Sequence, residues 1–373
     1  MDNNATTMLH PFLIKKMSKY YLNHYANPSA SHSAGRLANK GLEDSRKIIA
    51  QKLHCCAAEV IFTSGATESN NLILRGFMLA HPDKNHIITS DIEHASIYET
   101  CKDIHNKNRC NVTYVPVDRN GIIDLKKLEA AITPKTAIIS VMLANNEIGT
   151  IQPIQRIVRI ARRYGVPVHT DATQYVGKWK VNVKELGVDA LSASSHKFHG
   201  PNGVGFVYIH DGLNIAKCLT GGLSKEQRMR SSTPDVPSIV GMAQAIKFNL
   251  DSSRYERNYL RVKKMRDYLE ESIKKYFPTA KINGHAKFRM INTLSVSFPN
   301  VKSSKKLMLL LDRKKIIVNT GSACSAHKKS RILEHIGLPD NYINGTLRIS
   351  LSEYNTMREC QHVIRVLREI FAA

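Results

Sequence analysis

Short hydrophobic runs, each bounded by turn-forming residues, recur along the chain and predict buried β-strands. Between them lie segments with helical spacing, such as the one that places Leu42, Ile49 and Leu53 on a single face. Strands that alternate with helices are typical of a parallel α/β sheet. The expected strands cover residues 60–63, 85–90, 112–117, 137–142, 166–169 and 203–208.

The length and the hydrophobic content indicate two domains. A chain of 373 residues is too long for one simple core, and its 42% of hydrophobic residues is ample for two. We expect a large domain over residues 12–252. The charged helical stretch 251–275 would lead into a smaller C-terminal α/β domain over 253–373, which residues 1–11 would join.

A lysine and an aspartate form the first candidate site. Lys197 lies beside a Gly-Pro turn, and Asp171 ends a hydrophobic stretch about twenty-five residues upstream. A lysine amine can form an imine with an aldehyde, and a carboxylate can keep a pyridine nitrogen protonated. The pair therefore fits a pyridoxal phosphate (PLP) site. Taken alone it is also compatible with a solvated lysine and a turn-forming aspartate.

A phosphate site is indicated between a strand and a helix. Residues 64–71 follow a buried strand and precede a helical run at 72–79. Free backbone N–H groups and the positive end of a helix dipole meet at such a junction, beside the hydroxyls of Ser64 and Thr67. An ordinary N-capped helix has a similar composition. The spacing is not that of a P-loop, so a nucleoside triphosphate is not indicated.

These motifs and several others, taken in their order along the chain, resemble the cysteine desulfurases, which are PLP enzymes of aminotransferase class V. The resemblance covers essentially the whole length. The matching segments are 2–7, 27–29 with His32 and 35–36, 63–71, 93–94, 145–150, 169–174, 194–197 and 321–324.

The resemblance implies the fold of PLP-dependent transferases of fold type I. This fold has a large domain with a mainly parallel seven-stranded sheet and a smaller C-terminal α/β domain that carries the catalytic cysteine segment. It also implies PLP as the cofactor and a homodimer. Lys197 would hold PLP and move the α-proton of the substrate, a task that suits an amine with a lowered pKa.

The resemblance assigns roles to the other site residues as well. His94 would stack on the pyridine ring as part of the catalytic set, Asp171 would pair with the ring nitrogen, and Gln174 would hydrogen-bond the phenolic oxygen. Asn146 and Arg348 would bind the substrate carboxylate, to which a planar guanidinium is suited. The phosphate would be held by Ala66, Thr67, Ser194 and His196, and across the dimer interface by Thr233.

Cys324 determines the expected reaction type. A thiolate attacks sulfur far better than a thiol does. Small residues surround Cys324, and His327, Lys328 and Lys329 supply positive charge that favours its thiolate. The resemblance implies that Cys324 attacks the sulfur of PLP-bound L-cysteine, so that L-alanine leaves and a persulfide remains on the enzyme.

The cysteine pattern argues against disulfide and metal chemistry. The seven cysteines contain no CxxC, and their odd number gives no disulfide framework. Neither they nor the 16 histidines show zinc or Fe–S ligand spacing, so we expect no metal. The chain starts at a family motif, without a signal-peptide layout or a membrane-spanning apolar run. We expect a cytoplasmic protein without membrane contact.

The chain is strongly basic, with 54 Lys and Arg against 31 Asp and Glu and a formal charge of +23. Such a charge can serve RNA or an acidic protein. The basic residues are dispersed and lack interleaved aromatic residues, which favours a solvated surface over direct nucleic-acid binding. We expect a sulfur-acceptor protein as the partner: an Fe–S scaffold, a tRNA-thiolation enzyme or a dedicated carrier.

Three segments depart from the family pattern. Where relatives usually have three consecutive glycines, residues 221–226 read Gly-Gly-Leu-Ser-Lys-Glu, and residues 230–233 read Arg-Ser-Ser-Thr. The segment after Cys324 is shorter and more basic than in members that supply Fe–S scaffolds. Residues 351–356 lack the Gly-Arg pair that many relatives carry there.

Two alternatives stay open. One is a PLP enzyme with changed chemistry, such as a selenocysteine lyase or another C–S lyase or transferase, which alanine release dependent on Cys324 would distinguish. The other is a non-catalytic nucleic-acid-binding protein on an enzyme scaffold. The basic charge alone favours it, and the complete set of Lys197, Asp171, His94, Cys324 and Arg348 opposes it.

Overall fold

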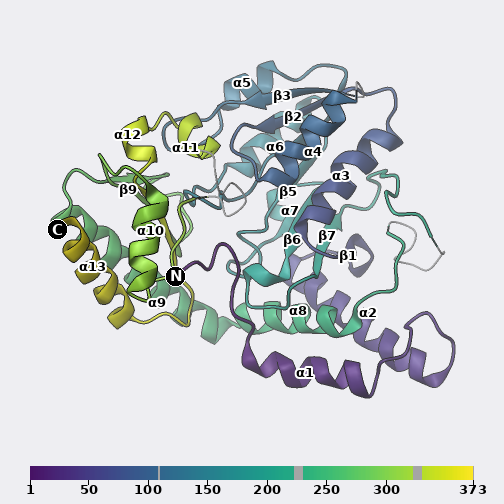
Figure 1. The fold of residues 1–373 in the computed structure, drawn as a ribbon. Coiled ribbons are helices and arrows are strands. Elements are labelled where there is room, and N and C mark those ends of the chain that lie inside the picture. Colours follow the sequence, from purple (N-terminus) through teal and green to yellow (C-terminus); the bar gives the residue numbers. More distant parts are fainter. Residues whose placement is uncertain (108–109, 222–229, 322–329, 373) are drawn as a thin grey trace.

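A seven-stranded sheet forms the centre of the larger of two lobes in this computed structural model, which describes residues 1–107, 110–221, 230–321 and 330–372 (Figure 1). The strand order is β1-β7-β6-β5-β4-β2-β3. The pairs from β6 to β3 are parallel, and β7 is antiparallel to both β1 and β6. The expected α/β fold with a mainly parallel sheet is therefore confirmed. The strands are β1 (Val60–Thr63), β2 (His86–Ser90), β3 (Asn111–Val115), β4 (Thr136–Ser140), β5 (Val168–Asp171), β6 (Ala190–Ser194) and β7 (Gly205–Ile209).

Helices cover both faces of this sheet because neighbouring strand residues point to opposite faces. Ile61 and Val207 pack with α3 and α4, whereas Phe62 and Phe206 pack with α2, α6 and α8 on the other face. The helices of this lobe are α1 (Pro11–Leu22), α2 (Ser33–Leu53), α3 (Ala66–Ala80), α4 (Ala95–Asn106), α5 (Leu125–Ala130), α6 (Ile154–Arg163), α7 (Val183–Leu186) and α8 (Val236–Asn249).

The smaller lobe is built on a three-stranded antiparallel sheet in the order β10-β9-β8. The long helix α9 leads into it, and the N-terminus returns to it, where Asp2 pairs with Ser350 (Figure 1). Its own hydrophobic core includes Leu269, Val296 and Leu367. The elements are α9 (Ser252–Tyr276), β8 (Lys281–Asn283), β9 (Thr293–Ser297), α10 (Ser304–Arg313), α11 (Arg331–His335), α12 (Asp340–Ile343), β10 (Thr346–Ser350) and α13 (Met357–Ala372).

All six strands expected from the sequence are present within a few residues, and the expected helix 251–275 is α9. The strand β6 was not expected. Its sequence, Ala-Leu-Ser-Ala-Ser, lacks the β-branched and aromatic residues that usually indicate a strand. All five of its residues are buried because β5 and β7 flank it on both sides.

The sheet topology brings several loops to one edge. Parallel strands end at the same edge, so the segments after β2, β4, β5 and β6 lie together. Because β7 is antiparallel to β6 and to β1, β1 ends there too. In the part of the chain that the structure describes, no helix has the length and apolar character needed to span a membrane.

Candidate active site

A cavity of about 570 Å³ lies at the carboxyl edge of the strands and is closed on one side by residues of the smaller lobe. Ten of the residues expected in the site line it, although they come from separate motifs. They are Ala66, Thr67, His94, Asn146, Asp171, Gln174, Ser194, His196, Lys197 and Arg348.

Thr233 and Cys324 were also expected in the site. Thr233 is exposed and lines an adjacent cavity of about 210 Å³ with Ser64 and Arg230. Cys324 lies outside the described residues, as do His327, Lys328 and Lys329.

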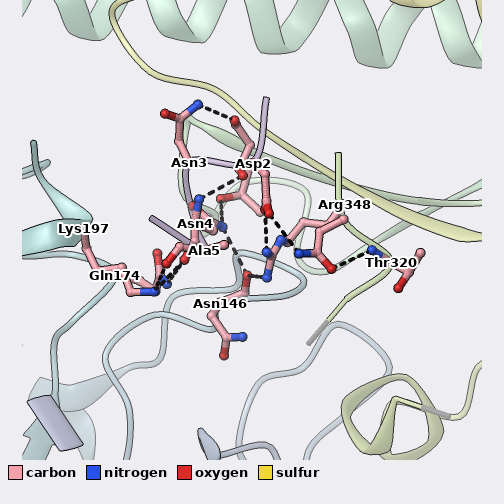
Figure 2. A network of polar contacts seen from close by, with 12 residues as sticks. Asp2, Asn3, Asn4, Ala5, Asn146, Gln174, Lys197, Thr320 and Arg348 are labelled. Carbon is pink, nitrogen blue, oxygen red and sulfur yellow. Dashed lines mark hydrogen bonds and ion pairs between the residues drawn. The ribbon is translucent and has the colours of Figure 1, made fainter. Parts of the chain in front are cut away.

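Lys197 ends the short 3₁₀ turn that follows β6, and its amine meets the N-terminal segment. The Nζ atom donates hydrogen bonds to the carbonyl oxygens of Asn4 at 2.8 Å and Ala5 at 2.7 Å (Figure 2). The same segment is tied to the lysine loop by Thr7, whose hydroxyl donates to the carbonyl of His196 and accepts from the backbone N–H of His199. The N-terminal segment therefore forms one wall of the site.

Asp171 ends β5 and is 5% exposed. One carboxylate oxygen accepts a hydrogen bond from the Asn70 side chain at 2.8 Å, and the other accepts from the backbone N–H of Thr173 at 3.0 Å. A carboxylate held in this way can accept a further hydrogen bond from a ring N–H.

His94 is the N-cap of α4, and this position orients its imidazole. Its Nδ1 atom accepts a hydrogen bond from the backbone N–H of Ser96 at 3.1 Å. Burial lowers the pKa of His94, and the positive charges of Lys197 and Arg331 lower it further against the opposing charge of Asp171. A neutral imidazole in this place is suited to stacking on an aromatic ring.

The start of α3 forms the proposed anion cradle. The N-cap is Gly65, which has no side chain to accept from the first helical N–H groups. The Ser194 hydroxyl lies beside Gly65, and Ala66 and Thr67 line the cavity. The Glu68 side chain accepts from the backbone N–H of Ser64 at 2.7 Å, which fixes the turn. These groups together provide backbone and hydroxyl donors for a phosphate.

Arg348 brings a buried positive charge from β10 to the opposite side of the cavity. It is 2% exposed and donates to the carbonyl oxygen of Asn146 at 3.1 Å (Figure 2). It also forms an ion pair with Asp2 at 2.7 Å. A guanidinium fixed by two partners still has further N–H groups with which to bind a carboxylate.

Three buried polar atoms on this cavity have no hydrogen-bond partner among the described residues. They are Asn146 Oδ1, Thr173 Oγ1 and Arg348 Nε. Buried polar groups in proteins are nearly always satisfied, so these atoms indicate a polar ligand. No cluster of three or more His, Cys, Asp or Glu side chains suited to a metal is found in the described ranges.

The family model for aminotransferase class V matches residues 1–363. A cysteine desulfurase IscS of Methanosarcina thermophila is 39% identical over 99% of this chain and 91% of its own length. The chain belongs to the cysteine desulfurases of aminotransferase class V. A cysteine desulfurase 2 of Trichormus variabilis is 36% identical over 99% of this chain and 92% of its own length.

Solved structures agree with this membership. A NifS-like protein superimposes with a TM-score of 0.93 at 36% identity, covering all of this chain and 98% of the other. The apo cysteine desulfurase of Thermococcus onnurineus NA1 gives a TM-score of 0.87 at 25% identity, covering 99% of this chain and 93% of the other. The recognised family, the fold and PLP as cofactor are thus confirmed, and the lysine, the aspartate and the anion cradle on this cavity fit PLP.

Several polar residues at or near the site had no predicted role. They are Asp2 and Asn4, which lie in the opening motif, and Lys178. The signal for Lys178 was its place four residues after the matched segment 169–174. Its proximity to Asn4 could not be read from the sequence, because more than 170 residues separate the two.

Proposed function

We propose that this cysteine desulfurase takes sulfur from L-cysteine, releases L-alanine and retains the sulfur as a persulfide on Cys324. The observation that supports it is the single cavity on which Lys197, Asp171 and Arg348 lie together, each from a separate segment. A carboxylate-binding arginine opposite a lysine is what an amino-acid substrate of a PLP enzyme requires.

The chain's residues divide the work around the cofactor. When bound, PLP draws electrons from the α-carbon of the substrate. Lys197 would hold the cofactor and move the α-proton, while Asp171 would accept a hydrogen bond from the ring nitrogen. Gln174 would donate to the phenolic oxygen and His94 would stack on the ring, since all four residues line the cavity. The phosphate would be bound by Ala66, Thr67, Ser194 and His196, and by Thr233 from the second subunit.

Arg348 and Asn146 position the substrate by its carboxylate. The Cys324 thiolate then attacks the substrate sulfur. A new S–S bond forms, the C–S bond breaks, and its electron pair goes to the substrate carbon, which takes a proton and becomes the methyl group of alanine. The positive charges of His327, Lys328 and Lys329 favour the thiolate.

The division of the chain and its setting belong to the same proposal. Residues 12–252 form the large domain, and residues 1–11 with 253–373 form the small domain. The active form is a cytoplasmic homodimer. It passes sulfur to an acceptor protein, either an Fe–S scaffold, a tRNA-thiolation enzyme or a dedicated carrier.

Single-turnover measurements with L-cysteine test the nucleophile. The Cys324→Ser variant should bind L-cysteine, because Arg348 and Asn146 are unchanged, but should release almost no alanine. In the wild-type protein, mass spectrometry should locate the persulfide on Cys324. The exposed Cys56 provides the control, since Cys56→Ser should release alanine at the wild-type rate. Undiminished alanine release by Cys324→Ser would refute the assignment, and a strong preference for L-selenocysteine would favour a selenocysteine lyase instead.

A further inference from the structure

Lys178 places a positive charge behind the cavity wall, in the turn that follows β5. Its Nζ atom donates a hydrogen bond to Gln174 Oε1 at 2.9 Å and lies 3.4 Å from Asn4 Oδ1. Its side chain also lines a narrow second cavity of about 90 Å³ between the lobes, together with Trp179 and Tyr259. No role described above uses this lysine.

The turn that carries Lys178 is packed tightly against the Lys197 segment. Gly177 has a φ of 74°, and a Cβ atom there would come within 2.4 Å of Phe198 Cγ. Phe198 directly follows Lys197 and is fully buried. The position of the Lys178 amine is therefore determined by the same packing that places Lys197.

The contact with Lys178 decides how the Gln174 amide is oriented. A glutamine side chain has one accepting end and one donating end, and a lysine ammonium can only donate. The oxygen of Gln174 faces Lys178, whose amine donates to it at 2.9 Å. Its Nε2 atom then points to the other side, where it donates to the carbonyl of Asn4 at 3.0 Å on the cavity wall (Figure 2). A flipped amide would place its NH₂ group against the ammonium.

The electrostatic surroundings of Lys178 are positive. Burial, together with the charges of Lys197 and Arg348, lowers its pKa to about 7. Lys178 in turn contributes to the lowered pKa values of His196 and His199. A buried ammonium among other cations is unfavourable unless anions or hydrogen-bond acceptors compensate its charge. The anionic phenolic oxygen and phosphate of PLP would compensate the positive charges of Lys178, Lys197 and Arg348.

We infer that Lys178 is a positioning residue, which holds the oxygen of Gln174 so that the amide NH₂ of Gln174 faces the phenolic oxygen of PLP. This inference rests on the role proposed above for Gln174. Because Lys178 acts through Gln174, removing either side chain should have the same consequence, and removing both should add little.

The test compares the pH dependence of the visible absorbance of the PLP-loaded protein in four forms. These are wild type, Lys178→Met, Gln174→Leu and the double variant. Loss of the hydrogen bond to the phenolic oxygen raises the basicity of the nitrogen that joins Lys197 to PLP. Gln174→Leu and Lys178→Met should therefore each raise the midpoint of the absorbance titration by about one pH unit. The double variant should have the same midpoint as Gln174→Leu alone.

Two further variants keep the result interpretable. Lys180→Met removes an exposed lysine two positions along and should leave the midpoint unchanged. Lys178→Gln keeps a donor without the charge and should remain closer to wild type than Lys178→Met, which also covers the case in which Lys178→Met folds poorly.

The possible outcomes distinguish failure of the positioning role of Lys178 from failure of the proposed role of Gln174. If Lys178→Met raises the midpoint equally in the presence and absence of Gln174, the lysine acts by its charge alone and the positioning role is wrong. If Gln174→Leu raises the midpoint and Lys178→Met does not, the inference also fails while the proposed role of Gln174 stands. If Gln174→Leu has no effect, both the role of Gln174 and the inference are overturned.

Discussion

Burial sets the protonation state of several side chains around the cavity. It lowers the pKa of His196 to about 4, with further contributions from Lys197 and Lys178. It also lowers the pKa of His169 to about 4, and this ring lies between the hydroxyls of Ser140 and Ser192. Both imidazoles are therefore neutral at physiological pH, and they act as hydrogen-bonding groups without charge.

Glu93 is the acidic counterpart, since it is 1% exposed and burial raises its pKa to about 8. Its carboxyl contacts the Ser90 hydroxyl at 2.5 Å and accepts from the backbone N–H of Met142. The folded protein holds this proton to a higher pH than the unfolded chain, whose value is near the ordinary 4.5. The free energy of unfolding should therefore decrease as pH rises from about 4.5 to about 8.

Glu93→Gln should remove this dependence, because glutamine imitates the protonated carboxyl and keeps both contacts. The variant should gain stability relative to wild type as pH rises, at about 1.4 kcal/mol for each pKa unit of the shift. Urea titrations at pH 5 to 9 measure this difference. The exposed Glu271→Gln on α9 should follow the wild-type curve. Parallel curves for wild type and Glu93→Gln would contradict a raised pKa.

At the scale of elements, the turn after β5 is packed closely against the segment that follows Lys197. Gly177→Ala would require a left-handed backbone at a residue with a Cβ and would also push that atom into Phe198. We expect a loss of about 2–4 kcal/mol in the free energy of unfolding, together with weaker retention of PLP.

Gly165 offers a matched control for this prediction. Its φ is 64°, similar to that of Gly177, but no atom lies within 4 Å of the Cβ position. Gly165→Ala should lose only about 1 kcal/mol, from backbone strain alone, and should retain PLP. Equal losses in the two variants, measured by denaturant unfolding, would show that contact with Phe198 is unimportant.

For the whole molecule, Asn4 links the two lobes through the site. Its side-chain NH₂ donates to the carbonyl of Asn146 and to the Thr293 hydroxyl, and its side-chain oxygen accepts from Asn292. Its backbone N–H donates to the Ser350 hydroxyl. Since Asn4 is 2% exposed, these bonds form in a nearly dry environment, and they join the cavity wall to the smaller sheet.

The proposed homodimer is the prediction at this scale. Helix α1 exposes Ile14 by 63%, Tyr21 by 56% and Leu22 by 73%, and we expect these side chains to contact the second subunit. Light scattering should give twice the chain mass of 41.9 kDa. Leu22→Glu should shift the protein toward monomer, whereas Leu309→Glu, on α10 of the smaller lobe, should not. A wild-type monomer with full PLP occupancy would refute the dimer.

Most of the fold could be predicted from the sequence because strands buried on both faces leave short hydrophobic runs that are easily recognised. The strand β6 could not, because Ala190–Ser194 is small and polar and becomes a strand only between two neighbours. The candidate site residues were predicted from motifs and from the family resemblance. Lysine, aspartate and arginine side chains are required by the chemistry, and they stand in recognisable motifs.

The sequence by itself determined the family and the cofactor and predicted the side chains that serve it, because its motifs match those of the family in type and in order. Only the tertiary structure decided that Asp2 pairs with Arg348, that Asn4 meets Lys197, and that Lys178 meets Asn4. The physical reason is that hydrophobic periodicity reports local burial alone. The partners of a buried polar group are set by sheet order and lobe packing, which bring residues hundreds of positions apart within hydrogen-bonding distance.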